Sequence, residues 1–216
     1  MNRQIILLTA VFAMNSALAK EINGCEIRSG TLCAEMNLQG ANLQKADLAR
    51  ANFLQSDLSG ANLQGAQLLN ANLHLANLNG ADLKGAMLDE ADLENTTMVD
   101  AKASQAHLRG ARLKSADLTR ADFTGAQLQG ADLSGANLTA ARFRDSQLQR
   151  ADLSGTVMRD ADFRGANMKG VKLDNATLAG ADFRGAVLDE IDFDKVNTAG
   201  CVGCPTLGRP LPEVVR

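Results

Sequence analysis

Residues 121–135 read ADFTG-AQLQG-ADLSG, and the same five-residue pattern extends in both directions from this stretch. An apolar residue recurs at every fifth position from Leu38 to Phe193, which gives 32 centres, 22 of them Leu and six of them Phe. Ala stands two positions before the centre in 25 repeats, and Gly stands two positions after it in 14. The consensus is therefore Ala-(Asn/Asp)-Leu-x-Gly.

A five-residue period fits neither a helix nor a straight strand. Five residues turn a helix by about 500°, so successive centres would wander around its surface. In a straight strand, five steps reverse the face. The pattern instead requires the chain to turn a corner once per pentapeptide, with the centre and the preceding Ala inside and Gly as a permissive corner. A chain that turns at every repeat coils into a solenoid.

The phenylalanines set the length of one coil. Phe123, Phe143, Phe163 and Phe183 are spaced by 20 residues, so four pentapeptides per coil stack these rings in a column. The 32 centres then make about eight coils, and at ~4.8 Å per coil the rod is about 40 Å long. A narrow core of Leu-sized and Ala-sized side chains also agrees with the absence of Trp and Tyr.

The repeats match a known family signature. Residues 41–43, 61–63, 81–83 and 131–135 read ANL, ANL, ADL and ADLSG, and in these runs the chain resembles the pentapeptide-repeat family. The resemblance covers about three quarters of the chain and implies an all-β fold, a right-handed quadrilateral β-helix over residues 36–198. Family members with an assigned activity include DNA mimics that protect type II topoisomerases from quinolones.

Residues 1–19 are predicted to be a secretory signal peptide. Arg3 supplies the positive start, residues 5–14 are apolar apart from Thr9, and Ala-Leu-Ala at 17–19 is a small-x-small cleavage site. The alternative is an apolar first strand of the fold. The stretch is too short for a transmembrane helix, and no later segment is apolar enough to span a membrane. We expect an exported protein, periplasmic or secreted, that begins at Lys20.

The two ends of the solenoid are predicted to be caps, residues 20–35 and 199–216, because open coils would expose apolar side chains and unpaired edges. Ile22, Ile27 and Leu32 are the expected plug of the first coil. The C-terminal cap could alternatively pair two molecules end to end.

All of the cysteines lie in these caps, at Cys25, Cys33, Cys201 and Cys204. The two pairs are at opposite ends of a rod of about 40 Å, whereas a disulfide needs Cα atoms within ~7 Å. We therefore predict that the first two bond to each other and the last two to each other, which export permits. The alternatives for the second pair are a zinc site, which would need two further ligands, and a redox motif.

The chain offers little chemistry for catalysis. A net charge of −3 excludes nucleic-acid binding through bulk positive charge. His74 and His107 flank different centres and point outward on different sides, and no nucleophile lies near either. The many Asp residues lie on a convex surface with no cleft to shift their pKa values. We predict no catalytic, cofactor-binding or metal-binding residues, and no enzyme activity.

One surface stripe is a candidate for binding. Arg144, Arg164 and Arg184 each follow a Phe of the column, so they stack at ~4.8 Å intervals on one side. Like charges on neighbouring strands are unfavourable, so this ladder would attract an anionic partner. The alternative is local neutralisation by Asp162 and Asp182, on the same side.

A second charged feature lies mid-chain. Residues 81–100 carry six acidic side chains and one Lys, whereas residues 101–120 carry five basic side chains and one Asp. The two coils either form ion pairs with each other or make a bipolar docking band.

These features favour a non-catalytic, exported binding or scaffold rod, whose partner is a protein or an anionic envelope component. The alternative is a DNA mimic that binds and protects a type II topoisomerase. A strongly acidic face is required of such a mimic, so the mild, mixed charge and the predicted export favour the first interpretation.

Overall fold

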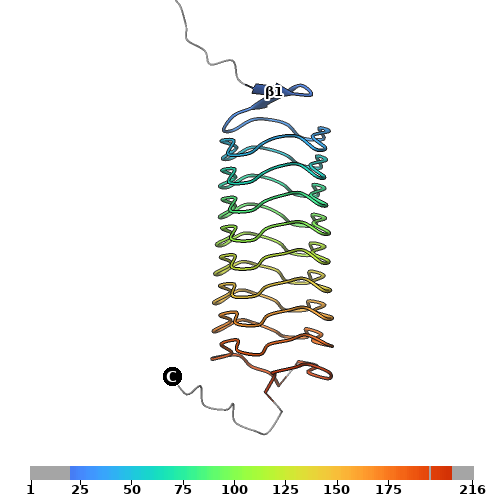
Figure 1. Cartoon of the computed structure of the whole chain (residues 1–216), viewed down its shortest axis with the longest axis vertical. Coiled ribbons are helices and arrows are strands. Elements are labelled where there is room, and N and C mark those ends of the chain that lie inside the picture. Colours follow the sequence, from blue (N-terminus) through green and yellow to red (C-terminus); the bar gives the residue numbers. More distant parts are fainter. Residues whose placement is uncertain (1–19, 195, 206–216) are drawn as a thin grey trace, which may run out of the picture.

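The computed structural model describes residues 20–194 and 196–205. Within these residues the chain winds into a rod of stacked coils (Figure 1). Parallel bridges join residues 20 positions apart, for example Asn42 with Asn62 and Asn62 with Asp82. One coil therefore contains four pentapeptides, as the spacing of the phenylalanines predicts. The right-handed sense and the count of about eight coils stay predictions.

The walls of the rod are ladders of single bridges. Nearly every pentapeptide contributes one bridged residue, the Asn or Asp position before the centre. The bonds alternate between coils: Leu43 N donates to Asn62 O at 2.8 Å, and Asn62 N donates to Ala41 O at 2.9 Å. Short bridged segments alternate with corners, so the part of the chain that the structure describes has only two longer strands, both at its N-terminal end.

The corners explain two positions of the consensus. Ala46 N donates to Leu43 O at 3.0 Å, and Lys45 between them has a φ of 55°, so this corner is a β-turn with a left-handed third residue, as in a type II turn. This left-handed conformation is the one that Gly adopts without steric cost. The Asn or Asp position holds the turn from the side, since Asn42 Oδ1 accepts a hydrogen bond from Gln44 N at 3.2 Å.

The core is the column of centres together with the Ala positions. Both sets are almost completely buried from Leu38 to Phe183, except for Ala46, which is partly buried. The rings of Phe123, Phe143, Phe163 and Phe183 stack with centroids 5.0 Å apart and planes within 6° of parallel, which confirms the predicted column. Hydroxyl residues at Ala positions bond to the backbone: Thr96 Oγ1 donates to Leu93 O at 2.7 Å. The repeat thus tolerates these departures without leaving a polar group unpaired.

A hairpin lies over the N-terminal end of the rod (Figure 1). Strands β1 (Lys20–Ile22) and β2 (Cys25–Ile27) pair antiparallel, and Ile22 and Ile27 pack against the core. The prediction for Leu32 is wrong, because its side chain is 85% exposed. Leu32 occupies the Asn/Asp position of its repeat and bridges to Asn52, so it points outward.

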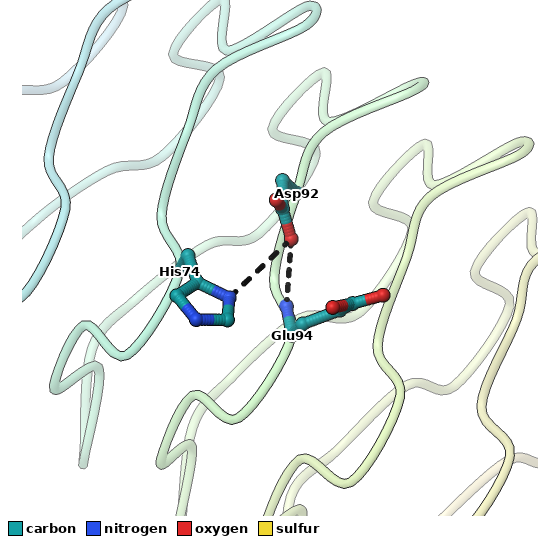
Figure 2. A group of neighbouring side chains, drawn as sticks. All are labelled: His74, Asp92 and Glu94. Atoms are coloured by element: carbon teal, nitrogen blue, oxygen red, sulfur yellow. Dashed lines mark hydrogen bonds and ion pairs between the residues drawn. The ribbon is translucent and has the colours of Figure 1, made fainter.

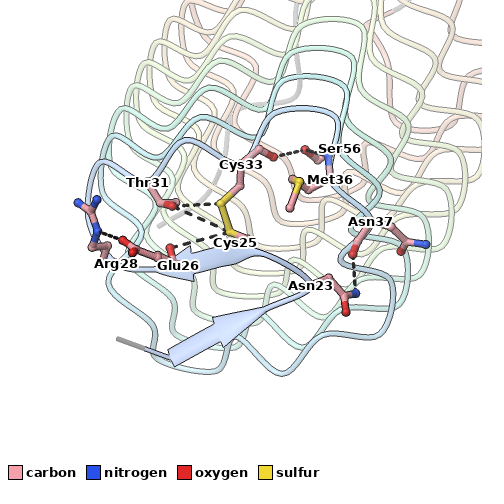
Figure 3. Close-up of a disulfide and its surroundings, with 9 residues drawn as sticks. All are labelled: Asn23, Cys25, Glu26, Arg28, Thr31, Cys33, Met36, Asn37 and Ser56. Carbon is pink, nitrogen blue, oxygen red and sulfur yellow. Dashed lines mark hydrogen bonds and ion pairs between the residues drawn. A yellow bond between two sulfur atoms is a disulfide. The ribbon is translucent and has the colours of Figure 1, made fainter. Parts of the chain in front are cut away.

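The cysteines meet in the predicted pairs. Cys25, in β2 of the hairpin, and Cys33 are at disulfide distance, with Cα atoms 5.4 Å apart, and both are buried (Figure 3). Cys33 occupies a centre position of the repeat, where Leu stands elsewhere. Cys201 and Cys204 are also at disulfide distance, with Cα atoms 5.9 Å apart.

The predicted signal peptide and residues 206–216 of the predicted C-terminal cap lie outside the described residues. In the part that is described, no helix has the length and apolarity needed to cross a membrane.

Candidate binding surface

The predicted arginine stripe lies on the side of the rod that covers the phenylalanine column, which we call the aromatic side (residues 42–44 and their equivalents every 20 residues, to 182–184). Each Arg of the stripe follows a buried Phe, so the alternation of side chains turns it outward. The backbone is fixed by the same turn as elsewhere: Arg184 N donates to Asp182 Oδ1 at 3.1 Å, and Arg164 N donates to Asp162 Oδ1 at 3.2 Å.

The structure brings the three arginines together and places two carboxylates between them. Arg144 donates from Nε to Asp162, which also lies 2.8 Å from a terminal nitrogen of Arg164. Arg164 Nε lies 3.6 Å from Asp182 Oδ2, and Arg184 pairs with the same oxygen at 2.6 Å. The result is a zigzag that crosses three coils, which we call the Arg–Asp ladder (Arg144, Asp162, Arg164, Asp182 and Arg184).

The two kinds of charge lie at different depths in this ladder. The Asp162 and Asp182 side chains are 16% and 19% exposed, whereas the three arginine side chains are 38% to 62% exposed. Hydrogen bonding to Arg184 lowers the pKa of Asp182 against the opposing effect of its partial burial. The carboxyl groups therefore lie beneath an outer layer of guanidinium groups, and the ladder contains three arginines and two aspartates.

The mid-chain charged coils pair with each other. Arg120 binds Asp100 through two hydrogen bonds of 2.7 and 2.6 Å, and Arg112 binds Glu94 at 2.6 Å. Asp89 Oδ1 accepts a hydrogen bond from Arg109 N at 2.7 Å. Opposite charges thus meet across the boundary between the two coils, which is the ion-pair alternative that the sequence left open.

Sequence reasoning missed one cluster, in which His74, Asp92 and Glu94 meet on the side of the rod opposite the aromatic side (Figure 2). Their candidate ligand atoms all lie within 4.8 Å of one another. The signal was present, because a coil of 20 residues places position 74 beside position 94. His107 lies apart from this group and contacts Gln127, with Nε2 atoms 3.4 Å apart.

Sequence comparison identifies the repeats. A family model described as pentapeptide repeats matches eight copies between residues 37 and 197. The chain belongs to the pentapeptide-repeat family. This assignment covers most of the rod and includes both the Arg–Asp ladder and the His74 cluster. No curated protein sequence matches the chain.

Several solved structures of pentapeptide-repeat proteins resemble this one. QnrB1, a plasmid-mediated fluoroquinolone resistance protein, is 20% identical with a TM-score of 0.57, over 81% of this chain and 91% of its own. HetL, involved in heterocyst differentiation in the cyanobacterium Nostoc, is 31% identical with a TM-score of 0.34, over 79% and 88% of the two chains. A protein of the Arabidopsis thaliana thylakoid lumen is 33% identical with a TM-score of 0.34, over 45% and 64%. The likeness to QnrB1 supports the β-helix fold.

Proposed function

We propose that this pentapeptide-repeat protein is a non-catalytic, exported binding or scaffold rod of about eight right-handed coils. Its partner is a protein or an anionic envelope component, which docks on the aromatic side. The observation that carries the proposal is the layering of the Arg–Asp ladder, in which the guanidinium groups are outermost and the carboxylates lie beneath them.

The ladder suits recognition because its arginines are already held in place. A guanidinium has five N–H donors in a rigid fork, and the carboxylates beneath use only some of them. Ordering a free arginine on binding costs roughly 0.5–1.5 kcal/mol, and a side chain already held by an ion pair loses less. An anionic group on a partner can therefore bind the outer donors at a low entropic cost.

The surface of the rod supports a binding role more than a catalytic one. The hollow on another side is lined by Gln129, Gly130, Gln149, Arg150 and Lys169. None of these is a histidine, a cysteine, a serine or a carboxylate, so this hollow lacks the usual pair of nucleophile and base. A charged surface without a paired nucleophile and base is better suited to docking than to catalysis.

Export is part of the proposal and rests on the predicted signal peptide. The cysteine pairs support it, since disulfides persist mainly in oxidising compartments. Fractionation of cells followed by intact-mass measurement tests this part. We expect a chain that begins at Lys20, outside the cytoplasm, and lighter than the reduced form by the four hydrogens of two disulfides. A full-length, reduced, cytoplasmic protein would contradict export.

The docking surface is tested with a triple substitution of Arg144, Arg164 and Arg184 to Gln. The control is Arg50, Arg109 and Arg159 to Gln, which removes the same charge from other parts of the rod. The probes are vesicles of anionic phospholipid, vesicles of zwitterionic phospholipid and a soluble acidic polysaccharide. We expect the ladder variant alone to lose binding to an anionic probe. Equal losses in both variants would mean that only bulk charge matters and would overturn the docking surface.

A protein partner requires a separate arm of the same test. A photocrosslinker at Thr124, on the aromatic side, is compared with one at Thr139, on a different side. Specific crosslinks from position 124 that disappear in the ladder variant support a protein partner. Crosslinks that survive the three substitutions, together with unchanged binding to the anionic probes, would refute this surface as the docking site.

Protection of a type II topoisomerase is a second candidate, which the fold shared with QnrB1 favours. Asp92, Glu94 and Asp100 of the middle coils are paired with arginines, which argues against an acidic, DNA-like face. The test is gyrase supercoiling in the presence of a quinolone. Restored supercoiling with the purified chain would place this candidate first, and no protection at micromolar protein would exclude it.

A further inference from the structure

We propose that His74, Asp92 and Glu94 form a binding site for a divalent transition metal of the zinc class. This site is separate from the Arg–Asp ladder and does not depend on the proposed function. The proposal rests on three observations: the register that aligns the residues, the convergence of their donor atoms, and a cationic group already held by the two carboxylates.

The repeat aligns the three residues on one wall of the rod (Figure 2). His74 follows the buried centre Leu73, and Asp92 and Glu94 flank the buried centre Leu93 of the next coil. His74 N donates to Asn72 Oδ1 at 3.1 Å, and Glu94 N donates to Asp92 Oδ1 at 3.0 Å. The backbones of both coils are therefore fixed by turns, and the side chains project from a rigid base.

The donor atoms converge to within a small side-chain movement of the separations that a metal can bridge. His74 Nδ1 lies 4.0 Å from Asp92 Oδ1, and the three candidate donors lie within 4.8 Å of one another. Zinc binds imidazole nitrogen and carboxylate oxygen at about 2.0–2.2 Å, so the side chains must swing inward by a small rotation. One nitrogen and two oxygens make a set that suits zinc, with a water as the fourth ligand.

The site is partly withdrawn from solvent and contains two carboxylates. The side chains of His74, Asp92 and Glu94 are 31%, 29% and 19% exposed. Both carboxylates pair with Arg112, which lies 2.6 Å from Glu94 and 3.6 Å from Asp92. Attraction for a divalent cation is stronger in such a setting than at a fully exposed pair.

Arg112 bears on the proposed metal site in two ways. Its guanidinium shows that these two carboxylates already hold a cationic group, and it also competes with a metal for the same oxygens. The Arg112 side chain is 56% exposed and can turn toward solvent when a metal enters. Removing the guanidinium should therefore strengthen metal binding, which an ion pair without a metal function would not predict.

The test is calorimetric titration of the full chain with zinc chloride under non-reducing conditions, which keep the cysteines oxidised. We expect one saturable site in the wild-type protein. His74→Ala and Asp92→Asn should weaken it by at least about tenfold, since even the loss of a group that only orients a ligand costs 10–100-fold. Arg112→Gln should tighten it. The matched control is His107→Ala, which should bind zinc like the wild type.

A second readout identifies the ligand directly. The chain has only two histidines, so the ring signals of His74 and His107 can be resolved by NMR in each variant. Zinc should shift the His74 signals and leave those of His107 in place. Circular dichroism and thermal unfolding establish that each variant is folded. No saturable binding by the wild type, wild-type affinity in folded His74→Ala, or an equal loss in His107→Ala would overturn the proposal.

Discussion

The two halves of the aromatic side have the same backbone conformation but differ in their buried centres and in the side chains on their surface. In the N-terminal half the buried centres are Leu43, Leu63, Leu83 and Ala103, and in the C-terminal half they are Phe123, Phe143, Phe163 and Phe183. Outside, the first half joins its coils by a neutral amide, with Gln64 Nε2 donating to Asp82 Oδ2 at 2.7 Å. The second half joins them by the Arg–Asp ladder.

The difference shows which part of the sequence specifies the fold. Both halves have the same 20-residue register of bridges and the same positive φ at their corners. Interior size and surface charge therefore vary while the coil is kept, because the corner and the main-chain ladder determine the path of the chain. A side of such a rod can acquire a binding surface without a change of fold, since its outward positions carry no core contacts.

The largest expected difference between the halves concerns the buried centres. Phe143→Ala should lower the free energy of unfolding by about 3–5 kcal/mol, because it removes a ring stacked on both faces. Leu63→Ala at the equivalent position of the other half should cost about 2–5 kcal/mol and less than the Phe substitution. Urea unfolding monitored by circular dichroism measures both. Equal losses would mean that the ring column adds nothing beyond ordinary burial.

The corners should behave alike in the two halves. Gly65 and Gly125 have φ values of 62° and 67°, and an added Cβ would meet only the side-chain stem of the corner residue one coil before. Gly65→Val and Gly125→Val should each lower stability by about 1–2 kcal/mol through left-handed strain. The same urea experiment checks this. A much larger loss in one half would show that corner and interior are coupled, against the comparison drawn above.

Most of the fold could be predicted from the sequence, because one pentapeptide pattern repeats along the chain and nearly every repeat adopts the same conformation. The spacing of the Phe centres gave the coil length, and the outward alternation placed the three arginines of the ladder on one side. Leu32 was misplaced because an apolar residue was assumed to lie inside, whereas its position in the repeat decided its direction. The depth of Asp162 and Asp182 beneath the guanidinium groups could not be predicted, since it depends on side-chain rotamers rather than on register.

The His74 cluster was missed for a different reason. The search for ligands followed spacing along the chain, whereas Asp92 and Glu94 are brought to His74 by the next coil. The 20-residue register already contained this contact. In a solenoid, a search for sites must therefore be made at the coil length as well as along the sequence.

The Arg–Asp ladder should contribute little to stability. Asp162→Asn removes the carboxylate that pairs with Arg144 and Arg164 at the surface. Exposed ion pairs are worth about 0–1 kcal/mol, so the expected loss lies in this range. The matched substitution in the other half is Asp82→Asn. Thermal unfolding of the two variants should give nearly the same small shift, and a loss of several kcal/mol in Asp162→Asn alone would assign the ladder a structural role.

The smallest expected effect concerns how the stability of the C-terminal half of the aromatic side changes at low pH. Hydrogen bonding to Arg184 lowers the pKa of Asp182 below its ordinary value of about 3.9. A carboxylate with a lowered pKa in the folded state adds stability that is fully present above the unfolded value and is lost as the pH falls through the folded value. Asp182→Asn should therefore narrow the difference in urea midpoint between pH 7 and pH 3. Asp82→Asn serves as the comparison, because Asp82 accepts its hydrogen bonds from Gln64 Nε2 and Lys84 N instead of from a guanidinium group. If the two variants respond equally to acid, the pairing with Arg184 has no energetic consequence, and the charged ladder is a feature of recognition alone.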